Sequence, residues 1–320
     1  MEDNKKWFKD AKFGLMIHWG LYSLPAGEWK GKRQLMGPEG VSEWIQYHFR
    51  IPCSEYERLA EAFNPIFFDA EEWVKLAENA GMKYIVMTSK HHDGFAMYDS
   101  KVDDFNIVNK TPFGRDVIKE LADACQKHNM KFGLYYSQEI DWHEENGGYY
   151  STKPNDKDAR SNDWDFPDDS KKDYSKCFEK KIKPQVREIL TNYGDLALVW
   201  FDMPRVITPE QSDELYYMVK KYQPNCLVNS RIGNDRGDYR SCGDNDISGE
   251  NVGNDLVEAP TTLNTTWGYK TFDNEWKSAE RVKEIKEHLN SRGINYLLNV
   301  GPDYLGRIPA MAADILKNVK

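Results

Sequence analysis

The sequence predicts a single domain over residues 1–320, folded as an α/β protein of the (β/α)8, TIM-like barrel type. Short apolar runs alternate with amphipathic helical stretches, which is the pattern of parallel strands joined by crossover helices. Polar residues follow directly on several of these runs, as they do where barrel strands deliver side chains to one face. Periodicity alone leaves an open, doubly wound sheet nearly as acceptable, so the polar residues favour the barrel.

The clearest helix–strand unit begins at Asp69, which can cap a helix because Glu72 follows three residues later. Gly81 ends that helix, and a strand follows. The same unit recurs along the chain, and six strands are predicted at residues 13–17, 84–88, 132–136, 196–201, 226–229 and 294–298. The remaining two strands are expected between residues 231 and 271, where Gly, Asn and Asp are frequent.

The stretch 138–176 is too long and irregular for an ordinary connection, so it is either functional or a mobile surface excursion. Because it follows a predicted strand, a barrel would place it on the face that holds the site. Its aromatic residues are candidates to line a substrate entrance: Trp142, Tyr149, Tyr150, Trp164 and Phe166.

Composition and charge exclude several classes of partner. The 320 residues carry a net charge of -9, which works against nucleic acid and against an anionic membrane surface. No run of about 18 apolar residues occurs, and the first residues are too polar for a secretory signal. We therefore expect a soluble protein, with a cytoplasmic, periplasmic or secreted location and the oligomeric state left open.

Polar residues at the strand ends are the candidate functional residues. His18, His91, His92, Asp202 and Arg231 all follow predicted strands closely. Burying a carboxylate directly after the apolar run 196–201 is costly unless it has a partner or a task. Asp202 is therefore either a structural ion pair with Arg231 or a nucleophile, and a nucleophile needs a second carboxyl group nearby.

Five segments, in order along the chain, resemble the α-L-fucosidases of glycoside hydrolase family 29. They are WFKDAKFGLMIHWG (7–20), KHHDGF (90–95), GLYYS (133–137), VWFD (199–202) and LLNVGP (297–302). The resemblance implies a retaining exo-α-L-fucosidase that removes terminal fucose from fucosylated glycans, with no metal and no cofactor. The family usually carries a C-terminal β-sandwich, which we expect this chain to lack.

The resemblance also assigns roles to individual residues. Asp202 matches the family's nucleophile. The substrate-binding residues that it implies are His18, Glu43, His91, His92, Tyr135, Trp200, Arg231 and Trp267.

Subgroups of the family draw the acid/base residue from different loops. One subgroup has a Trp-Glu pair about ten residues before a TWGY-like segment, and here the Glu is Glu258, with Val257 in place of the Trp. Another subgroup uses a Gly-Asn-Glu segment, and here that place reads GDND at 243–246. We therefore predict Glu258 as the acid/base, with Glu250 in reserve.

Two other functions compete with this interpretation. In a metal-dependent barrel hydrolase, His18, His91 and His92 would be metal ligands, but no His-x-His pair follows the first strand. A catalytically inactive fucose-binding protein would keep the pocket without turnover, although both predicted carboxylates are present.

Overall fold

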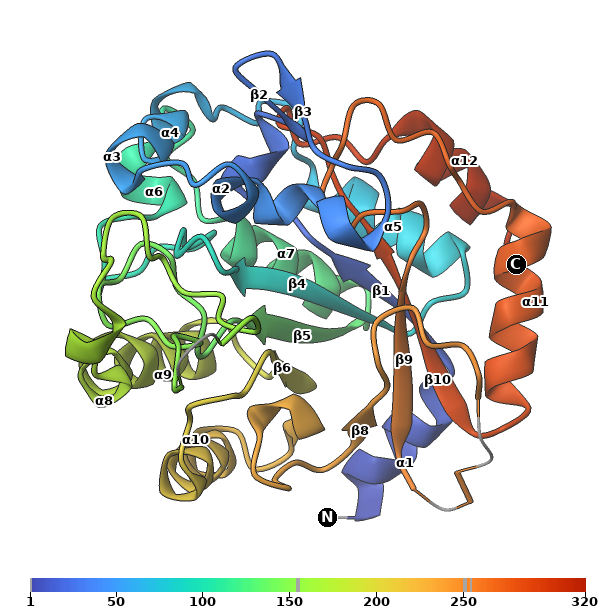
Figure 1. Cartoon of the computed structure of the whole chain (residues 1–320). Helices are drawn as coiled ribbons and strands as arrows, with labels where there is room; N and C mark the ends of the chain where they lie inside the picture. The colour runs from blue at the N-terminus through green and yellow to red at the C-terminus, as the bar shows by residue number, and fades with distance from the viewer. Residues whose placement is uncertain (1, 154–155, 250–251, 254) are drawn as a thin grey trace.

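The computed structural model describes residues 2–153, 156–249, 252–253 and 255–320. Its main feature is an eight-stranded sheet in which every neighbouring pair is parallel (Figure 1). The strands, in their order across the sheet, are β7 (Leu227–Val228), β6 (Leu198–Phe201), β5 (Lys131–Tyr136), β4 (Tyr84–Lys90), β1 (Phe13–Ile17), β10 (Ile294–Val300), β9 (Val257–Thr262) and β8 (Arg240–Ser241).

Backbone contacts bring the two outer strands of this sheet together. Asn229, directly after β7, forms a parallel bridge with Tyr239, directly before β8. The amide of Asp238 also donates to the carbonyl of Val228 at 2.6 Å. The sheet therefore curls into an irregular (β/α)8 barrel, and the predicted fold class is confirmed.

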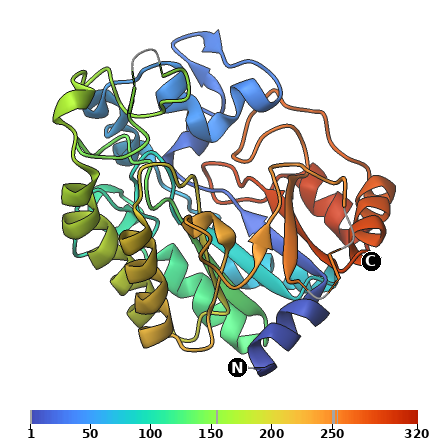
Figure 2. The ribbon, with the colours of Figure 1, turned by 60° about the horizontal axis from the view of Figure 1, so that its bottom comes forward.

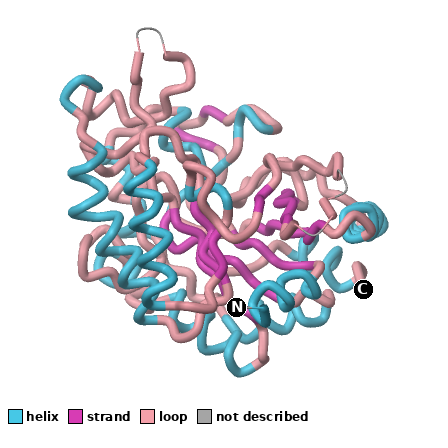
Figure 3. The backbone as a smooth tube through the Cα atoms, turned by 90° about the horizontal axis from the view of Figure 1, so that it is seen from below, coloured by secondary structure: helices cyan, strands magenta, loops and turns pink. Residues whose placement is uncertain are grey.

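Helices surround the strands, as the view from below shows (Figure 3). The longer helices are α1 (Glu2–Ala11), α5 (Ala70–Asn79), α7 (Val117–Lys127), α9 (Lys183–Asn192), α10 (Pro209–Tyr222), α11 (Ala279–Asn290) and α12 (Ala310–Lys317). Short helices α2 (Ile45–His48), α3 (Cys53–Tyr56), α4 (Leu59–Ala62), α6 (Ile107–Lys110) and α8 (Tyr174–Cys177) lie in the loops, with the hairpin β2 (Glu28–Trp29) and β3 (Lys32–Arg33). Helices α9 and α10 lie side by side along one flank (Figure 2).

Alternation along each strand separates two apolar layers. In β6, Val199 and Phe201 point outward into the layer shared with the helices, whereas Leu198 and Trp200 point into the barrel. The next inward position after Trp200 is Asp202. The period of two therefore sends the carboxylate to the carboxyl end of the barrel interior, where barrel enzymes hold their sites.

The amino end of the barrel is closed by α1. Phe8 is buried, and its ring lies 6.1 Å from that of Tyr84 and 4.6 Å from that of Tyr239. Gly14 is required beside them, because a Cβ atom there would lie 2.4 Å from the Tyr84 ring. This end is packed solid, which leaves the carboxyl end as the open one.

All six predicted strands are present, and the other two lie in the predicted interval. Strand β8 has only two residues, and β9 contains Glu258, Pro260 and two threonines, so neither has an apolar run that sequence patterns can detect. Among the described residues, no helix is long and apolar enough to cross a membrane.

Candidate active site

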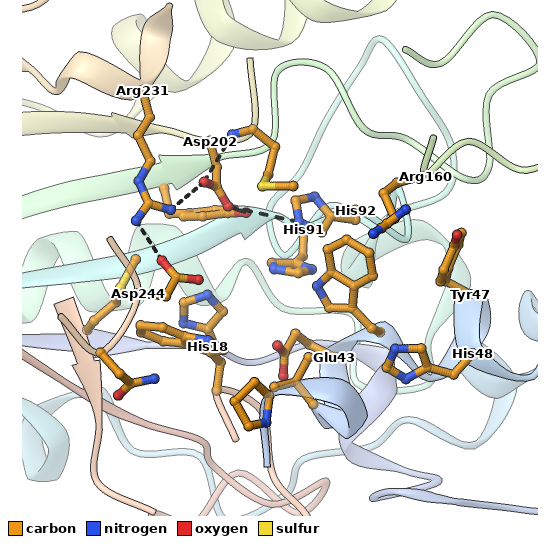
Figure 4. Close-up of a pocket in the computed structure, with 18 of the residues that line it drawn as sticks. His18, Glu43, Tyr47, His48, His91, His92, Arg160, Asp202, Arg231 and Asp244 are labelled. Carbon is orange, nitrogen blue, oxygen red and sulfur yellow. Dashed lines mark hydrogen bonds and ion pairs between the residues drawn. The ribbon is translucent and has the colours of Figure 1, made fainter. Parts of the chain in front are cut away.

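A cavity of about 630 Å³ opens at the carboxyl ends of the strands (Figure 4). Nine of the ten residues proposed from the sequence line it: His18, Glu43, His91, His92, Tyr135, Trp200, Asp202, Arg231 and Trp267. They come from the ends of β1, β4, β5 and β6, from the segment after β7, and from two loops. The tenth, Glu258, does not line the cavity.

The Asp202 carboxylate is held by three hydrogen bonds, with His92 as a further neighbour. Arg231 Nη1 donates to Oδ1 at 2.9 Å, and the amide of Met203 donates to the same oxygen at 3.0 Å. The Tyr135 hydroxyl donates to Oδ2 at 2.9 Å, and His92 Nε2 lies 3.9 Å from that oxygen. Both oxygens of the carboxylate are thus held in one orientation.

Arg231 joins Asp202 to a second carboxylate. Its Nη2 atom donates to Asp244 Oδ1 at 2.6 Å, while Nη1 holds Asp202. The guanidinium also lies over the Trp200 ring, 4.7 Å from its centroid. The two carboxylates raise the pKa of Arg231 and keep it charged, although burial acts in the opposite direction. Both acidic side chains lie beside this one guanidinium (Figure 4).

The three cavity histidines proposed from the sequence, His18, His91 and His92, are neutral. Burial lowers the pKa of His18 to about 4, and burial together with neighbouring positive groups lowers the pKa of His91 and His92 well below its usual range. At neutral pH these rings therefore add no charge to the cavity, and each offers one donor and one acceptor nitrogen.

Hydrogen bonds behind the rings fix which nitrogen carries the proton. Asn299 donates its amide to the Trp267 carbonyl, so its Oδ1, 2.7 Å from His18 Nδ1, must accept from that nitrogen. Ser137 donates to the Ile140 carbonyl, so its oxygen accepts from His92 Nδ1 at 2.7 Å. In both rings Nε2 is left as an acceptor, which suits a ligand rich in hydroxyl groups.

Glu43 and Trp267 also line the cavity. The amide of Gly268 donates to Glu43 Oε2 at 2.9 Å, and burial raises the pKa of Glu43 to about 7. The Trp267 ring lies 5.1 Å from the His18 ring and presents a flat apolar surface to the cavity. Such surfaces stack on the C–H faces of sugar rings.

Glu258 lies inside the barrel, near its amino end. It is the second residue of β9, opposite Asn295 of β10, and it is fully buried. The Tyr84 hydroxyl donates to Oε2 at 2.7 Å, and the Trp200 indole donates to Oε1 at 2.9 Å. It is separated from the cavity by Trp200, whose ring forms part of the cavity lining.

Glu250, the reserve acid/base, lies outside the described residues. Asp244 was not singled out from the sequence, although it belongs to the GDND segment that matched the acid-bearing loop of one subgroup. It lines the cavity, and about half of its side chain is exposed (54%). Among the cavity carboxyl groups, Asp244 is therefore the one that shares Arg231 with Asp202.

The long loop 138–176 contributes Arg160 to the cavity lining rather than the five aromatic residues expected there. Trp142 is buried behind the wall, edge-on to Trp44 and His92. The Trp164 indole donates to the Ile51 carbonyl at 2.9 Å. Trp142 and Trp164 therefore pack the loop against neighbouring segments, and none of the five aromatic residues lines the cavity itself.

Metal ligation is the role that the competing hypothesis gives to the histidines. Among the described residues, no group of three or more His, Cys, Asp or Glu side chains is arranged to hold a metal ion. The Nδ1 atoms of His18 and His92 are instead engaged by Asn299 and Ser137.

Fold and site together define a barrel protein whose cavity, at the carboxyl ends of its strands, is lined by carboxylates, neutral histidines and aromatic rings, an arrangement typical of glycoside hydrolases. The family model for α-L-fucosidase matches residues 1–320, and the chain belongs to that family.

Solved structures agree with this family assignment. The α-L-fucosidase AlfC of Lactobacillus casei, in complex with α-L-fucose product, is 51% identical, with a TM-score of 0.93 and coverage of 99% of this chain and 97% of that chain. The α-L-fucosidase of Vibrio sp. strain EJY3 is 36% identical, with a TM-score of 0.90 and coverage of 100% of this chain and 54% of that chain.

Curated relatives are more distant and longer. A putative α-L-fucosidase of Caenorhabditis elegans is 29% identical, and the match covers 98% of this chain and 64% of that protein. The plasma α-L-fucosidase of Homo sapiens is 26% identical, with coverage of 98% and 66%. The chain thus spans slightly less than two thirds of the length of these relatives.

Proposed function

We propose that this chain is a retaining exo-α-L-fucosidase that hydrolyses terminal α-L-fucose from glycans. The observation that carries the proposal is the pair of carboxylates, Asp202 and Asp244, held on the two terminal nitrogens of Arg231. Retaining glycosidases place their two carboxyl groups about 5 to 5.5 Å apart. A single guanidinium between two carboxylates suits that spacing.

In the first step, the Asp202 carboxylate attacks the anomeric carbon and forms a glycosyl ester. The bond from that carbon to the leaving oxygen breaks, and the leaving oxygen takes a proton from the acid. In the second step the same residue, now a base, removes a proton from water, which attacks the anomeric carbon and releases Asp202. Two inversions give net retention of configuration.

We propose Asp244, rather than Glu258, as this acid/base. An acid must reach the glycosidic oxygen, and geometry takes precedence over the pKa in choosing it. Asp244 borders both the cavity and solvent, so it can exchange protons with either. Glu258 is fully buried, both of its oxygens accept hydrogen bonds, and it lies near the amino end of its strand.

The remaining lining residues suit a neutral sugar. The Nε2 atoms of His18 and His92 accept from hydroxyl groups, and Trp267 offers an apolar face to a C–H surface or a methyl group. Fucose presents hydroxyl groups together with one methyl group. A fucosylated glycan is accordingly the substrate class that we propose.

The test is release of nitrophenol from 4-nitrophenyl α-L-fucopyranoside, compared with the β-D-galactoside and the α-L-rhamnoside. A variant of the Lactobacillus casei relative binds this same fucoside, which supports its choice. We expect turnover of the fucoside alone, and Asp202→Gly should lower it by several orders of magnitude while circular dichroism stays native.

Other outcomes would contradict the proposal in different ways. Fucose binding without turnover by the wild type would identify a binding protein instead. Loss of activity on chelation, with recovery on adding zinc, would favour the metal-dependent hydrolase. If Asp202→Gly keeps more than about a tenth of the wild-type turnover, a residue other than Asp202 is the nucleophile.

A further inference from the structure

Asp202 lies one residue beyond β6, where pairing with the next strand has already ended. Strands β6 and β7 pair only at Leu198 with Leu227 and at Val199 with Val228. Buried backbone amides must nevertheless be satisfied, because an orphaned N–H costs about 1–3 kcal/mol. Some other group must therefore bond the last amides of this segment.

Two side-chain carboxamides take over from the strand pairing. Asn229 Oδ1 accepts from the amide of Phe201 at 2.9 Å, and its Nδ2 donates to the carbonyl of Phe201 at 2.9 Å. Gln138 Oε1 accepts from the amide of Asp202 at 2.7 Å. The backbone amide of the proposed nucleophile is thus hydrogen-bonded to the side chain of Gln138.

Gln138 also bonds the residue that pairs with the nucleophile. Its Nε2 donates to the backbone carbonyl of Arg231 at 3.0 Å. An amide N–H can only donate and a carbonyl can only accept, so only one orientation of the carboxamide fits between them. Gln138 is itself fully buried, and its own carbonyl accepts from the Tyr174 hydroxyl at 2.8 Å.

Asp202 and Arg231 are consequently joined twice. Their side chains form the ion pair at 2.9 Å, and Gln138 links the backbone of one to the backbone of the other. The residue after the nucleophile, Met203, has a left-handed backbone with φ 56°, and its amide bonds Asp202 Oδ1. A left-handed conformation is costly for a residue other than glycine, so hydrogen bonds from neighbouring groups must hold the backbone at Asp202 and Met203 in place.

We infer that Gln138 is a positioning residue that sets the geometry between the nucleophile Asp202 and Arg231. This inference rests on the proposed function. Gln138 does not line the cavity, so it acts through Asp202 and Arg231 and touches no substrate. Its loss should therefore slow the attack of Asp202 and leave sugar binding by the other lining residues intact.

The first test is Gln138→Met, which keeps the length of the side chain and removes both hydrogen bonds. On 4-nitrophenyl α-L-fucopyranoside we expect kcat to fall about 10- to 100-fold, because a displacement on the order of 1 Å can cost that much. The inhibition constant of L-fucose should stay within about twofold of the wild-type value, because ground-state contacts are kept.

The matched control is Gln185→Met. Gln185 is also fully buried, and it bonds the Tyr136 hydroxyl at 2.8 Å and Ser100 Oγ at 3.3 Å, away from the cavity. A general cost of losing a buried glutamine should destabilise both variants similarly, whereas only Gln138→Met should lose kcat. Equal kcat values for the two variants would overturn the inference.

Gln138→Glu gives a second readout that does not depend on how well Gln138→Met folds. An ionised carboxylate still accepts from the Asp202 amide, but it cannot donate to the Arg231 carbonyl; a protonated one can do both. Three charged residues lie around position 138. Asp202 and Arg231 are bonded through their backbones to the Gln138 side chain, and Glu139, the next residue, accepts from the amide of Arg205. We expect the ratio of variant to wild-type kcat to rise as the pH falls.

A ratio that does not change with pH would overturn the inference, because the bond to Arg231 would then not matter. Wild-type turnover separates the two possible failures. No turnover by the wild type would contradict the proposed function and this inference with it. Normal turnover by both the wild type and Gln138→Met would overturn this inference alone.

Discussion

Burial raises the pKa of Glu258 to about 7, a value that suits a general acid near neutral pH. The donors Tyr84 and Trp200 lower it only in part. The same burial removes Glu258 from the cavity, so its raised pKa reports desolvation inside the barrel. The pKa of Glu258 suits a general acid, but its position does not. Position takes precedence, because a general acid must reach the glycosidic oxygen to protonate it.

The acid/base can be assigned with an activated fucoside and azide. A good leaving group such as dinitrophenolate departs without an acid, so an acid/base variant completes the first step and stalls at the second. We expect Asp244→Ala to show a burst of dinitrophenol. Azide should raise its steady-state rate and yield a β-fucosyl azide, because one inversion by Asp202 precedes the azide attack.

Glu258→Ala and Glu250→Ala are the comparison variants for this experiment. Neither should show the burst or the azide effect, although Glu258→Ala should be less stable because it leaves the Tyr84 and Trp200 donors unpaired. If azide rescues either of these variants and leaves Asp244→Ala unaffected, the acid/base is the residue that the rescued variant replaces.

At the scale of the element, helix α5 begins where its capping signal predicted. Asp69 Oδ1 accepts from the amide of Glu72 at 3.0 Å, and the helix runs from Ala70 to Asn79. Gly81 follows with φ 82°, in the left-handed region that glycine adopts freely. The apolar side of the helix buries Trp73, Val74 and Ala77.

Asp69→Ala should lower the free energy of unfolding by about 1 kcal/mol, the usual cost of a lost helix cap. Denaturant unfolding measures this, and kcat should not change because the cap lies on the outer layer. Asp69→Asn keeps a cap acceptor and serves as the control. If Asp69→Asn is as destabilised as Asp69→Ala, the loss does not come from the cap.

Strand β9 shows why a local pattern can miss an element. Its six residues, VEAPTT, are all buried, yet only two of them are apolar and non-proline. It is a strand because β10 and β8 pair with it on either side. Its polar groups are satisfied by partners far along the chain, such as Tyr84 for Glu258 and Asn245 for Thr262.

At the scale of the whole molecule, buried carboxyl groups couple stability to pH. Burial raises the pKa of Glu43, Asp93, Glu139 and Glu258 to about 7 each. A carboxyl group whose pKa is higher in the folded chain binds its proton more tightly there. Its stabilising contribution is therefore complete below the unfolded pKa and is lost as the pH rises through the folded one.

For Glu258 this window runs from its ordinary pKa of 4.5 to about 7. Relative to Glu258→Gln, the wild type should lose stability across that window by up to on the order of 3 kcal/mol, from the size of the pKa shift. Urea unfolding at several pH values in the window measures the difference between the two proteins. A difference that stays constant from pH 4.5 to 7.5 would show that Glu258 does not titrate there.

The sequence by itself predicted six of the eight strands, because strand and helix periodicities are local. The polar residues at the strand ends favoured the barrel, and a period of two sends residues such as His18 and Asp202 to one end of it. The resemblance to the fucosidase family supplied the rest of the nine residues that line one cavity. Only the tertiary structure revealed that Asp244 shares Arg231 with Asp202, that Glu258 is buried away from the cavity, and that Gln138 bonds the backbones of Asp202 and Arg231. Sequence cannot tell which end of an unrecognised strand holds Glu258, nor that Arg231 reaches Asp244 from another loop, because these contacts depend on how distant segments pack in space.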